Sequence, residues 1–243
     1  IEAVAENLHG ADITLDFPSV GATENIVCAA VHADGVTTVR NAAREPEVAD
    51  LCELLVEMGA RIDGIGSSVV VIDGVARGSL HTVEHAVVND RIQAATYMAA
   101  AAVTGGDVLV RGARADHMQM FLRKISDMGV DVIASSEGVR VATSGRLRNV
   151  DVQTLPYPGV ATDYKPLLVT MMAVAEGVGV MTENLYPGRF RYVEELSKLG
   201  ADIRTDGHHA IVHGVEQLRG AAVVAPDIRA GAALVVAGLV AEG

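Results

Sequence analysis

A repeat with a period near 70 residues limits what this chain can fold into more than any other feature of the sequence. The pattern Met58-Gly59-Ala60 returns as Met128-Gly129-Val130 and as Leu199-Gly200-Ala201, so its glycines lie 70 and then 71 positions apart. Each instance ends an amphipathic run and precedes two short β-forming stretches. Self-similarity at a fixed period indicates one supersecondary unit copied along the chain, and the fold is therefore predicted from that unit.

Each copy of the unit opens with a helix of small, almost wholly apolar residues, expected at 25–31, 94–103 and 167–175. A glycine turn follows, because glycine suits the left-handed residue that closes a helix. After the turn comes a strand, expected at 36–39, 108–110 and 178–181. An amphipathic helix is next, with apolar residues at three- and four-residue steps, as at Val48, Leu51 and Leu55. Two strands close the unit, which gives the order helix, strand, helix, strand, strand.

The apolar helix predicts the architecture, because a helix that is apolar all round is a buried one. One such helix per copy implies an α/β fold with helices at the centre and sheets outside them. A fourth copy begins at Asp227, continues as an apolar run at 230–241, and reaches Gly243 where earlier copies begin their strand. At the front, Ile1 is not an initiator methionine, and residues 1–15 resemble the closing strands of another copy. We therefore expect an internal fragment of a longer chain.

Composition disfavours several classes of protein. The net charge of -12 disfavours binding to nucleic acid or to an anionic membrane, which calls for a basic patch. The longest apolar stretch, at 230–241, has 12 residues, well short of the ~20 that cross a bilayer. Cys28 and Cys52 are the only cysteines, and we expect both to be buried free thiols in a reducing cytoplasm. No CxxC, HExxH or Walker-type loop is present, so neither a metal nor a cofactor is predicted.

Polar residues stand where the buried helices begin. Asp90, Asp163 and Asp227 open three of these helices, and Ser19 lies at the corresponding place in the first copy. The simplest interpretation is that all four are N-caps, since Asp and Ser accept hydrogen bonds from free backbone N–H groups and suit the helix dipole.

A second interpretation stays open beside capping. Buried parallel helices bring their N-termini to one face of a domain, where N–H groups and dipoles form an anion site. Arg91, Arg189 and Arg229 near the same level would add charge-assisted contacts to carboxylate or phosphate. Asp163 stands apart because a Pro- and Gly-punctuated loop at 154–162 leads to it, and an ionised Asp there can accept a proton from a substrate hydroxyl. A counterpart loop is expected at 182–190, around Pro187.

Several stretches carry a family resemblance, and two of them, PSVGATEN at Pro18–Asn25 and NAAREPE at Asn41–Glu47, are specific. The others are Asp90-Arg91-Ile92, Ala161-Thr162-Asp163, Thr182-Glu183-Asn184, Arg189-Phe190 and Asp227-Ile228-Arg229-Ala230. On these residues the chain resembles the bacterial UDP-N-acetylglucosamine 1-carboxyvinyltransferases, most closely those of actinobacteria, over its whole length.

The resemblance implies an inside-out α/β barrel fold, with two domains of three repeated units each. It places the crossing between domains at 87–89, so that 1–88 is the C-terminal part of the first domain and 89–243 a second domain truncated at its C-terminus. The implied reaction transfers the enolpyruvyl group from phosphoenolpyruvate to the 3'-hydroxyl of UDP-N-acetylglucosamine. This is the committed, cytoplasmic step of peptidoglycan synthesis, and it needs no cofactor.

The resemblance also implies residue roles. Asp163 matches an acid that contacts the sugar hydroxyl and is a candidate base, while Arg189 and Arg229 match arginines that meet phosphoenolpyruvate. The residues expected at the substrates are Phe17, Pro18, Ser19, Val20 and Gly21 around the uridine diphosphate, Leu185 at the sugar, and Arg91, Asp163 and Asp227. Phe17 departs from the family pattern, because many members carry a lysine there. The family's general acid, a cysteine or an aspartate, lies on a loop that these 243 residues do not contain.

Two alternatives accompany this interpretation. The chain could be a catalytically silent nucleotide-sugar-binding or structural fragment, which a nucleotide titration would reveal as binding without turnover. It could also be a shikimate-pathway enolpyruvyl transferase, although the motifs of that class differ at the PSVGATEN and NAAREPE positions.

Overall fold

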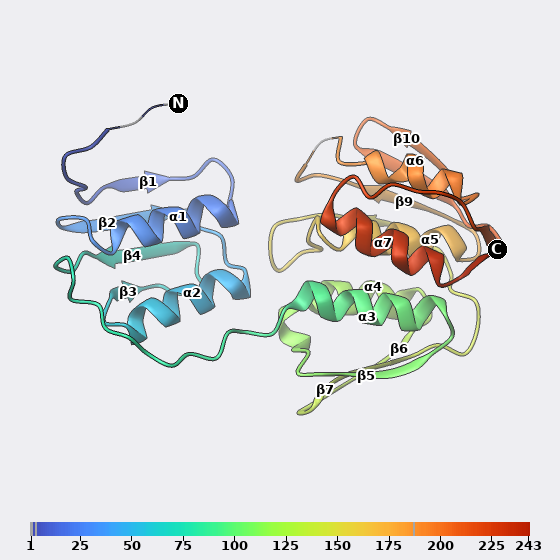
Figure 1. The fold of residues 1–243 in the computed structure, drawn as a ribbon, viewed down its shortest axis with the longest axis horizontal. Helices are drawn as coiled ribbons and strands as arrows, with labels where there is room; N and C mark the ends of the chain where they lie inside the picture. The colour runs from blue at the N-terminus through green and yellow to red at the C-terminus, as the bar shows by residue number, and fades with distance from the viewer. Residues whose placement is uncertain (1, 3, 187) are drawn as a thin grey trace. The chain divides into compact units, whose positions relative to one another are not determined.

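The predicted order helix, strand, helix, strand, strand occurs three times in the computed structural model (Figure 1). Residues 2, 4–186 and 188–243 are described; Ile1, Ala3 and Pro187 lie outside them. The first copy is α1 (Val20–Ala30), β2 (Val36–Arg40), α2 (Pro46–Glu57), β3 (Arg61–Asp63) and β4 (Val69–Asp73). The second is α3 (Arg91–Val103), β5 (Asp107–Arg111), α4 (Gln119–Asp127), β6 (Asp131–Ser135) and β7 (Gly138–Ala142), with a 3-10 turn, η1 (Ala115–His117), before α4. The third is α5 (Lys165–Val174), β9 (Val178–Thr182), α6 (Arg191–Lys198), β10 (Asp202–Asp206) and β11 (His209–His213).

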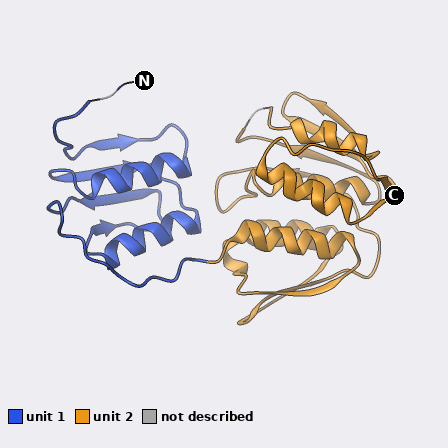
Figure 2. Ribbon diagram, viewed as in Figure 1, with its two compact units in different colours: residues 1–88 blue, residues 89–243 orange. Residues whose placement is uncertain are grey.

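The remaining elements are β1 (Asp12–Thr14), β8 (Val152–Gln153), β12 (Leu218–Arg219), α7 (Ile228–Gly238) and β13 (Ala241–Glu242). The chain divides into two compact units, Ile1–Val88 and Asn89–Gly243 (Figure 2). α7 ends at Gly238, three residues before the predicted end, because Ala241 already pairs with Leu218 in a parallel sheet.

The sheets repeat one topology. In each copy the strand after the first helix lies beside the last strand of the unit and antiparallel to it, as β9 does with β11 and β5 with β7. Except before α3, whose sheet consists of β5, β7 and β6, a short strand before the helix pairs parallel to the strand that follows the helix: β1 with β2, β8 with β9, and β12 with β13. This pairing corrects the prediction for residues 1–15. Within this segment Asp12–Thr14 form β1, the counterpart of β8 and β12, whereas the closing strands of a unit are an antiparallel pair.

In the unit Asn89–Gly243 the helices α3, α5 and α7 pack on one another at the centre, with the strands outside them (Figure 1). This confirms the inside-out arrangement. α5 is the helix whose residues 165–173 are all buried, as its all-round apolarity predicts. α3 and α7 each keep one side in solvent, where Tyr97 is 64% and Val235 67% exposed, so apolarity predicted more burial than these two helices have.

In the unit Ile1–Val88 the helix α1 packs on α2, β2 and β4 through Thr23, Val27 and Ala30. Cys28 of the same helix is exposed, which corrects the expectation that both thiols are buried. Cys52 of α2 is buried, and burial raises the pKa of its thiol to about 11. At neutral pH that thiol is therefore protonated and a poor nucleophile.

Candidate functional site

Three of the four polar residues at the helix starts are N-caps. The side chains of Ser19, Asp90 and Asp227 accept hydrogen bonds from backbone N–H groups in the first turns of α1, α3 and α7, at distances between 2.7 and 3.3 Å. The simpler interpretation is thus confirmed for these three residues, each of which fixes the start of a helix.

Asp163 is the exception. The N-cap of α5 is Tyr164, whose side chain makes no cap hydrogen bond. Arg189 Nη1 donates to Asp163 Oδ1 at 2.8 Å, and Arg229 Nε donates to Asp163 Oδ2 at 2.9 Å. The three side chains keep 31%, 26% and 29% of their surface exposed, in the order Asp163, Arg189, Arg229. The structure therefore brings together the three residues predicted to be catalytic, which lie far apart in the sequence.

Each member of this cluster comes from a different segment. Asp163 ends the loop before α5, Arg189 lies just before α6, and Arg229 lies in the first turn of α7, whose start is fixed by the cap at Asp227. One carboxylate faces two guanidinium groups, so one positive charge is left over at a place that solvent reaches. Charge-assisted hydrogen bonds from guanidinium groups favour carboxylate or phosphate ligands at such a place.

A buried ion pair supports the cluster. Lys165 Nζ lies 2.8 Å from Glu183 Oε2, and both side chains are fully buried. Burial alone raises the pKa of Glu183, but hydrogen bonds from Lys165, Thr154, Thr162 and the Leu185 backbone outweigh it and lower that pKa to about 2. Burial also lowers the pKa of Lys165, against the pull of Glu183. Sequence reasoning missed this pair, although a lysine in an otherwise apolar helix is itself a signal, since a buried charge needs a partner.

Arg91 is buried against aromatic rings. Its guanidinium carbon lies 5.7 Å from the ring centroid of Tyr157 and 5.6 Å from that of Tyr164, and Nη1 donates to the Tyr164 hydroxyl at 3.4 Å. Both tyrosines belong to the segment that carries Asp163, and such cation–π contacts hold Arg91 against it. The predicted role of Arg91 in substrate binding stays a prediction.

The other predicted substrate residues have defined surroundings. Leu185 is half-buried, and its backbone N–H donates to Glu183 at 2.8 Å. In the unit Ile1–Val88, five residues form the entry into α1 and its first turn: Phe17, Pro18, Ser19, Val20 and Gly21. Phe17 is exposed and Gly21 has open space where a side chain would be. A nucleotide at this turn stays a prediction.

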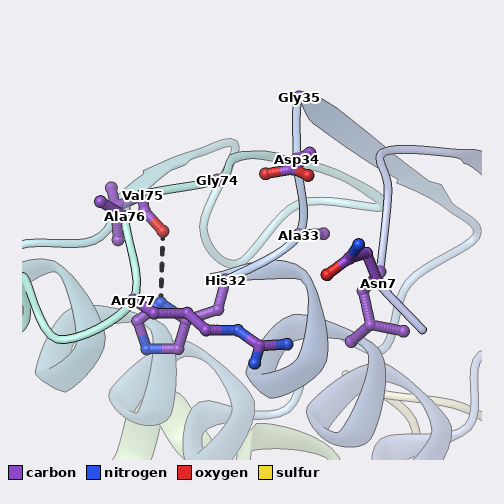
Figure 3. A pocket seen from close by; sticks show the side chains of 10 residues that line it. Asn7, His32, Ala33, Asp34, Gly35, Gly74, Val75, Ala76 and Arg77 are labelled. Atoms are coloured by element: carbon purple, nitrogen blue, oxygen red, sulfur yellow. Dashed lines mark hydrogen bonds between the residues drawn. The ribbon is translucent and has the colours of Figure 1, made fainter. Parts of the chain in front are cut away.

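Two pockets lie at the C-terminal ends of the helices that open the copies, away from the N-terminal ends that carry the predicted site residues. One, of about 490 Å³, follows α1 and is lined by Asn7, His32, Asp34 and Arg77, with His32 Nδ1 3.3 Å from the Val75 carbonyl (Figure 3). The other, of about 420 Å³, lies where α3, α5 and α7 end, beside Arg146. Neither contains a residue of the predicted site.

Within the described part of the chain, no three His, Cys, Asp or Glu side chains are grouped so as to hold a metal ion. None of the helices described is both long and apolar enough to span a membrane.

The repeated fold is that of the enolpyruvyl transferases. The crystal structure of the enolpyruvyl transferase NikO from Streptomyces tendae matches 98% of this chain and 59% of its own, with a TM-score of 0.87 at 26% identity. The EPSP synthase of Acinetobacter baumannii has the same fold, with a TM-score of 0.71 at 23% identity over 98% of this chain and 57% of its own.

The chain belongs to the family described as EPSP synthase (3-phosphoshikimate 1-carboxyvinyltransferase), whose family model matches residues 1–243. Curated relatives are more specific. The UDP-N-acetylglucosamine 1-carboxyvinyltransferases of Mycobacterium leprae and Nocardia farcinica are each 53% identical to this chain over all its 243 residues. Those residues span 58% and 57% of the respective relatives. The resemblance inferred from the sequence is thereby confirmed.

Proposed function

We propose that these residues are part of a UDP-N-acetylglucosamine 1-carboxyvinyltransferase, which transfers the enolpyruvyl group of phosphoenolpyruvate to the 3'-hydroxyl of the sugar and releases phosphate. The names of relatives 53% identical over the whole chain support this proposal. The likeness to EPSP synthase, at 23% identity, supports the fold alone. The reaction would serve peptidoglycan synthesis in the cytoplasm, with two small-molecule substrates and neither nucleic acid nor membrane as a partner.

The observation that carries the proposal is the position of Asp163 between two arginines instead of over the start of α5. Each arginine has five N–H donors and directs one of them to Asp163, so each can also bind an anion. When phosphoenolpyruvate takes up these donors, the Asp163 carboxylate is free to accept the proton of the sugar hydroxyl. The hydroxyl oxygen then bonds to C2 of phosphoenolpyruvate, while the methylene carbon of phosphoenolpyruvate gains a proton. The enol ether forms when that carbon loses a proton and the C–O bond to phosphate breaks.

The units Ile1–Val88 and Asn89–Gly243 would have different roles in such an enzyme. We propose that Ile1–Val88 is the C-terminal part of the first domain of such an enzyme, with the turn at 17–21 at the uridine diphosphate. Asn89–Gly243 would belong to the second domain, where Leu185 meets the sugar and Arg91 and Asp227 complete the substrate-binding set. What supports this division is the separation of the chain into two compact units and the repetition of the order helix, strand, helix, strand, strand in both.

An assay of phosphate release tests the proposal. In the complete encoded protein, phosphate should appear only when phosphoenolpyruvate and UDP-N-acetylglucosamine are both present. Shikimate 3-phosphate in place of the nucleotide sugar separates the two enolpyruvyl transferases. Phosphate release from phosphoenolpyruvate with shikimate 3-phosphate but not with UDP-N-acetylglucosamine would contradict the proposal. Binding of the nucleotide sugar without any phosphate release would favour a catalytically silent protein.

Replacing Arg229 with Lys should weaken the use of phosphoenolpyruvate more than the binding of UDP-N-acetylglucosamine. Lysine keeps the charge but loses the planar set of donors that suits a carboxylate. Losing one hydrogen bond to a charged group costs about 1.5–3 kcal/mol, or roughly a 10- to 100-fold rise in KM for phosphoenolpyruvate. The matched control is Arg219→Lys at an exposed position of β12. Equal losses for both substrates in steady-state kinetics would instead indicate a folding role for Arg229.

A further inference from the structure

The buried pair Lys165–Glu183 reaches both loops of the candidate site. Glu183 Oε1 accepts hydrogen bonds from Thr154 Oγ1 at 2.6 Å and from the backbone N–H groups of Leu185 and Tyr186 at 2.8 and 3.0 Å. Glu183 Oε2 accepts from Thr162 Oγ1 at 2.7 Å and from Lys165. One carboxylate thus fixes the loop that leads to Asp163 and the loop that leads to Arg189.

Glu183 and Lys165 each make a hydrogen bond next to a predicted catalytic residue. Thr162, whose hydroxyl donates to Glu183, is the neighbour of Asp163 and accepts from Arg189 Nη1 at 3.2 Å. Lys165 Nζ donates to the backbone carbonyl of Arg189 at 2.5 Å. The Asp163 segment and the Arg189 segment are therefore both tied to the same buried charges.

Aromatic rings close the lysine end of the pair. Lys165 Nζ lies 4.2 Å from the ring centroid of Phe190, which follows Arg189 directly, and 5.9 Å from that of Tyr192. A cation over a ring face is stabilised, and the Lys165 side chain is fully buried in these surroundings. Such a pair is costly to desolvate and contributes little to stability. What it does provide is a fixed geometry for the two loops that it joins.

We infer that Lys165 and Glu183 are positioning residues, which act through Thr162 and Arg189 to hold the Asp163 carboxylate and the Arg189 guanidinium at a fixed separation. Neither residue touches substrate in this role. The inference rests on the proposed function for its kinetic consequence, but its geometric part concerns this chain alone. A displacement of about 1 Å at a reacting group can cost on the order of 10²-fold in rate, so loss of the pair should appear in kcat.

The test uses Glu183→Gln and the double variant Lys165→Met/Glu183→Gln in the complete encoded protein. The single variant leaves a buried lysine unpaired and can unfold, whereas the double variant removes both charges and should keep the fold. We expect the double variant to lower kcat by roughly 10- to 100-fold, with little change in KM for UDP-N-acetylglucosamine. Lys198→Gln, which removes an ion pair with Glu195 on the exposed side of α6, is the matched control and should leave kcat unchanged.

Coupling to Arg189 separates positioning from general stability. If the pair acts through Arg189, the Lys165→Met/Glu183→Gln change should lower kcat much less in an Arg189→Lys protein than in the wild type. The reason is that Arg189→Lys already disturbs the interaction through which the pair acts. Additive losses, or a double variant with wild-type kcat, would overturn the inference. If the wild-type protein itself shows no transfer, the proposed function fails. The inference is then decided by a crystal structure of the double variant, in which the Arg189 Nη1 to Asp163 Oδ1 hydrogen bond should be lost.

Discussion

Replacing Asp163 with Ala in the complete encoded protein is expected to lower turnover by ~10²- to 10⁴-fold, the usual cost of losing a general base. The carboxylate lies in hydrogen-bond contact with Arg189 and Arg229 and caps no helix, so its removal takes away a charged group at the site and no helix cap. Affinity for the nucleotide sugar should stay measurable, because the residues proposed to hold the nucleotide lie in the turn at 17–21. Single-turnover phosphate release and a nucleotide titration measure the two effects.

Two further variants separate chemistry from structure. Asp163→Asn keeps the size of the side chain and one acceptor oxygen but cannot take up the proton, so it should be nearly as slow as Asp163→Ala. Asp202→Ala, at the exposed start of β10, is the control for a lost surface carboxylate and should be as fast as the wild type. Near-normal turnover in Asp163→Ala would show that this carboxylate only pairs with the arginines.

Most of the fold could be predicted from the sequence, because the repeat and the helical periodicity express the same physical demand. A residue such as Ala99 or Leu168 is buried because its helix is surrounded, and a period near 70 residues repeats that surrounding. The errors about burial have one cause. Apolarity shows that a helix face can be buried, but the number of neighbours decides whether it is, as Cys28 of α1 and Val235 of α7 demonstrate.

The site was predicted in part. Asp163, Arg189 and Arg229 were recognised from helix starts and motifs, but capping and catalysis gave the same sequence signal at Ser19, Asp90, Asp163 and Asp227. The loop at 154–162 sets Asp163 apart in the sequence, but the side-chain geometry is what shows that Ser19, Asp90 and Asp227 are caps and Asp163 is not. The Lys165–Glu183 pair escaped prediction because its two residues lie on different elements, and sequence pattern does not show which buried charges meet.

The 243-residue chain by itself is expected to release no phosphate from the two substrates. The transfer needs a proton taken from the sugar hydroxyl and a proton delivered to the methylene carbon of phosphoenolpyruvate. Asp163 can serve the first movement, but the resemblance places the acid for the second on a loop that these residues do not contain. Loss of the further cationic contacts to the substrate phosphate would add to the defect, since electrostatic stabilisation usually dominates such steps.

The design of this experiment depends on the two cysteine thiols, Cys28 and Cys52. Cys52 is buried with a pKa of about 11, so it cannot approach a substrate, whereas Cys28 is exposed on α1 and within reach of solvent. The experiment therefore measures phosphate release by the purified chain and by its Cys28→Ser variant, with both substrates present and with each omitted. Release that depends on both substrates would contradict the expectation. If that release disappears in Cys28→Ser, the exposed thiol is the acid, and if it persists, the acid is a group that neither the sequence nor the family resemblance indicates.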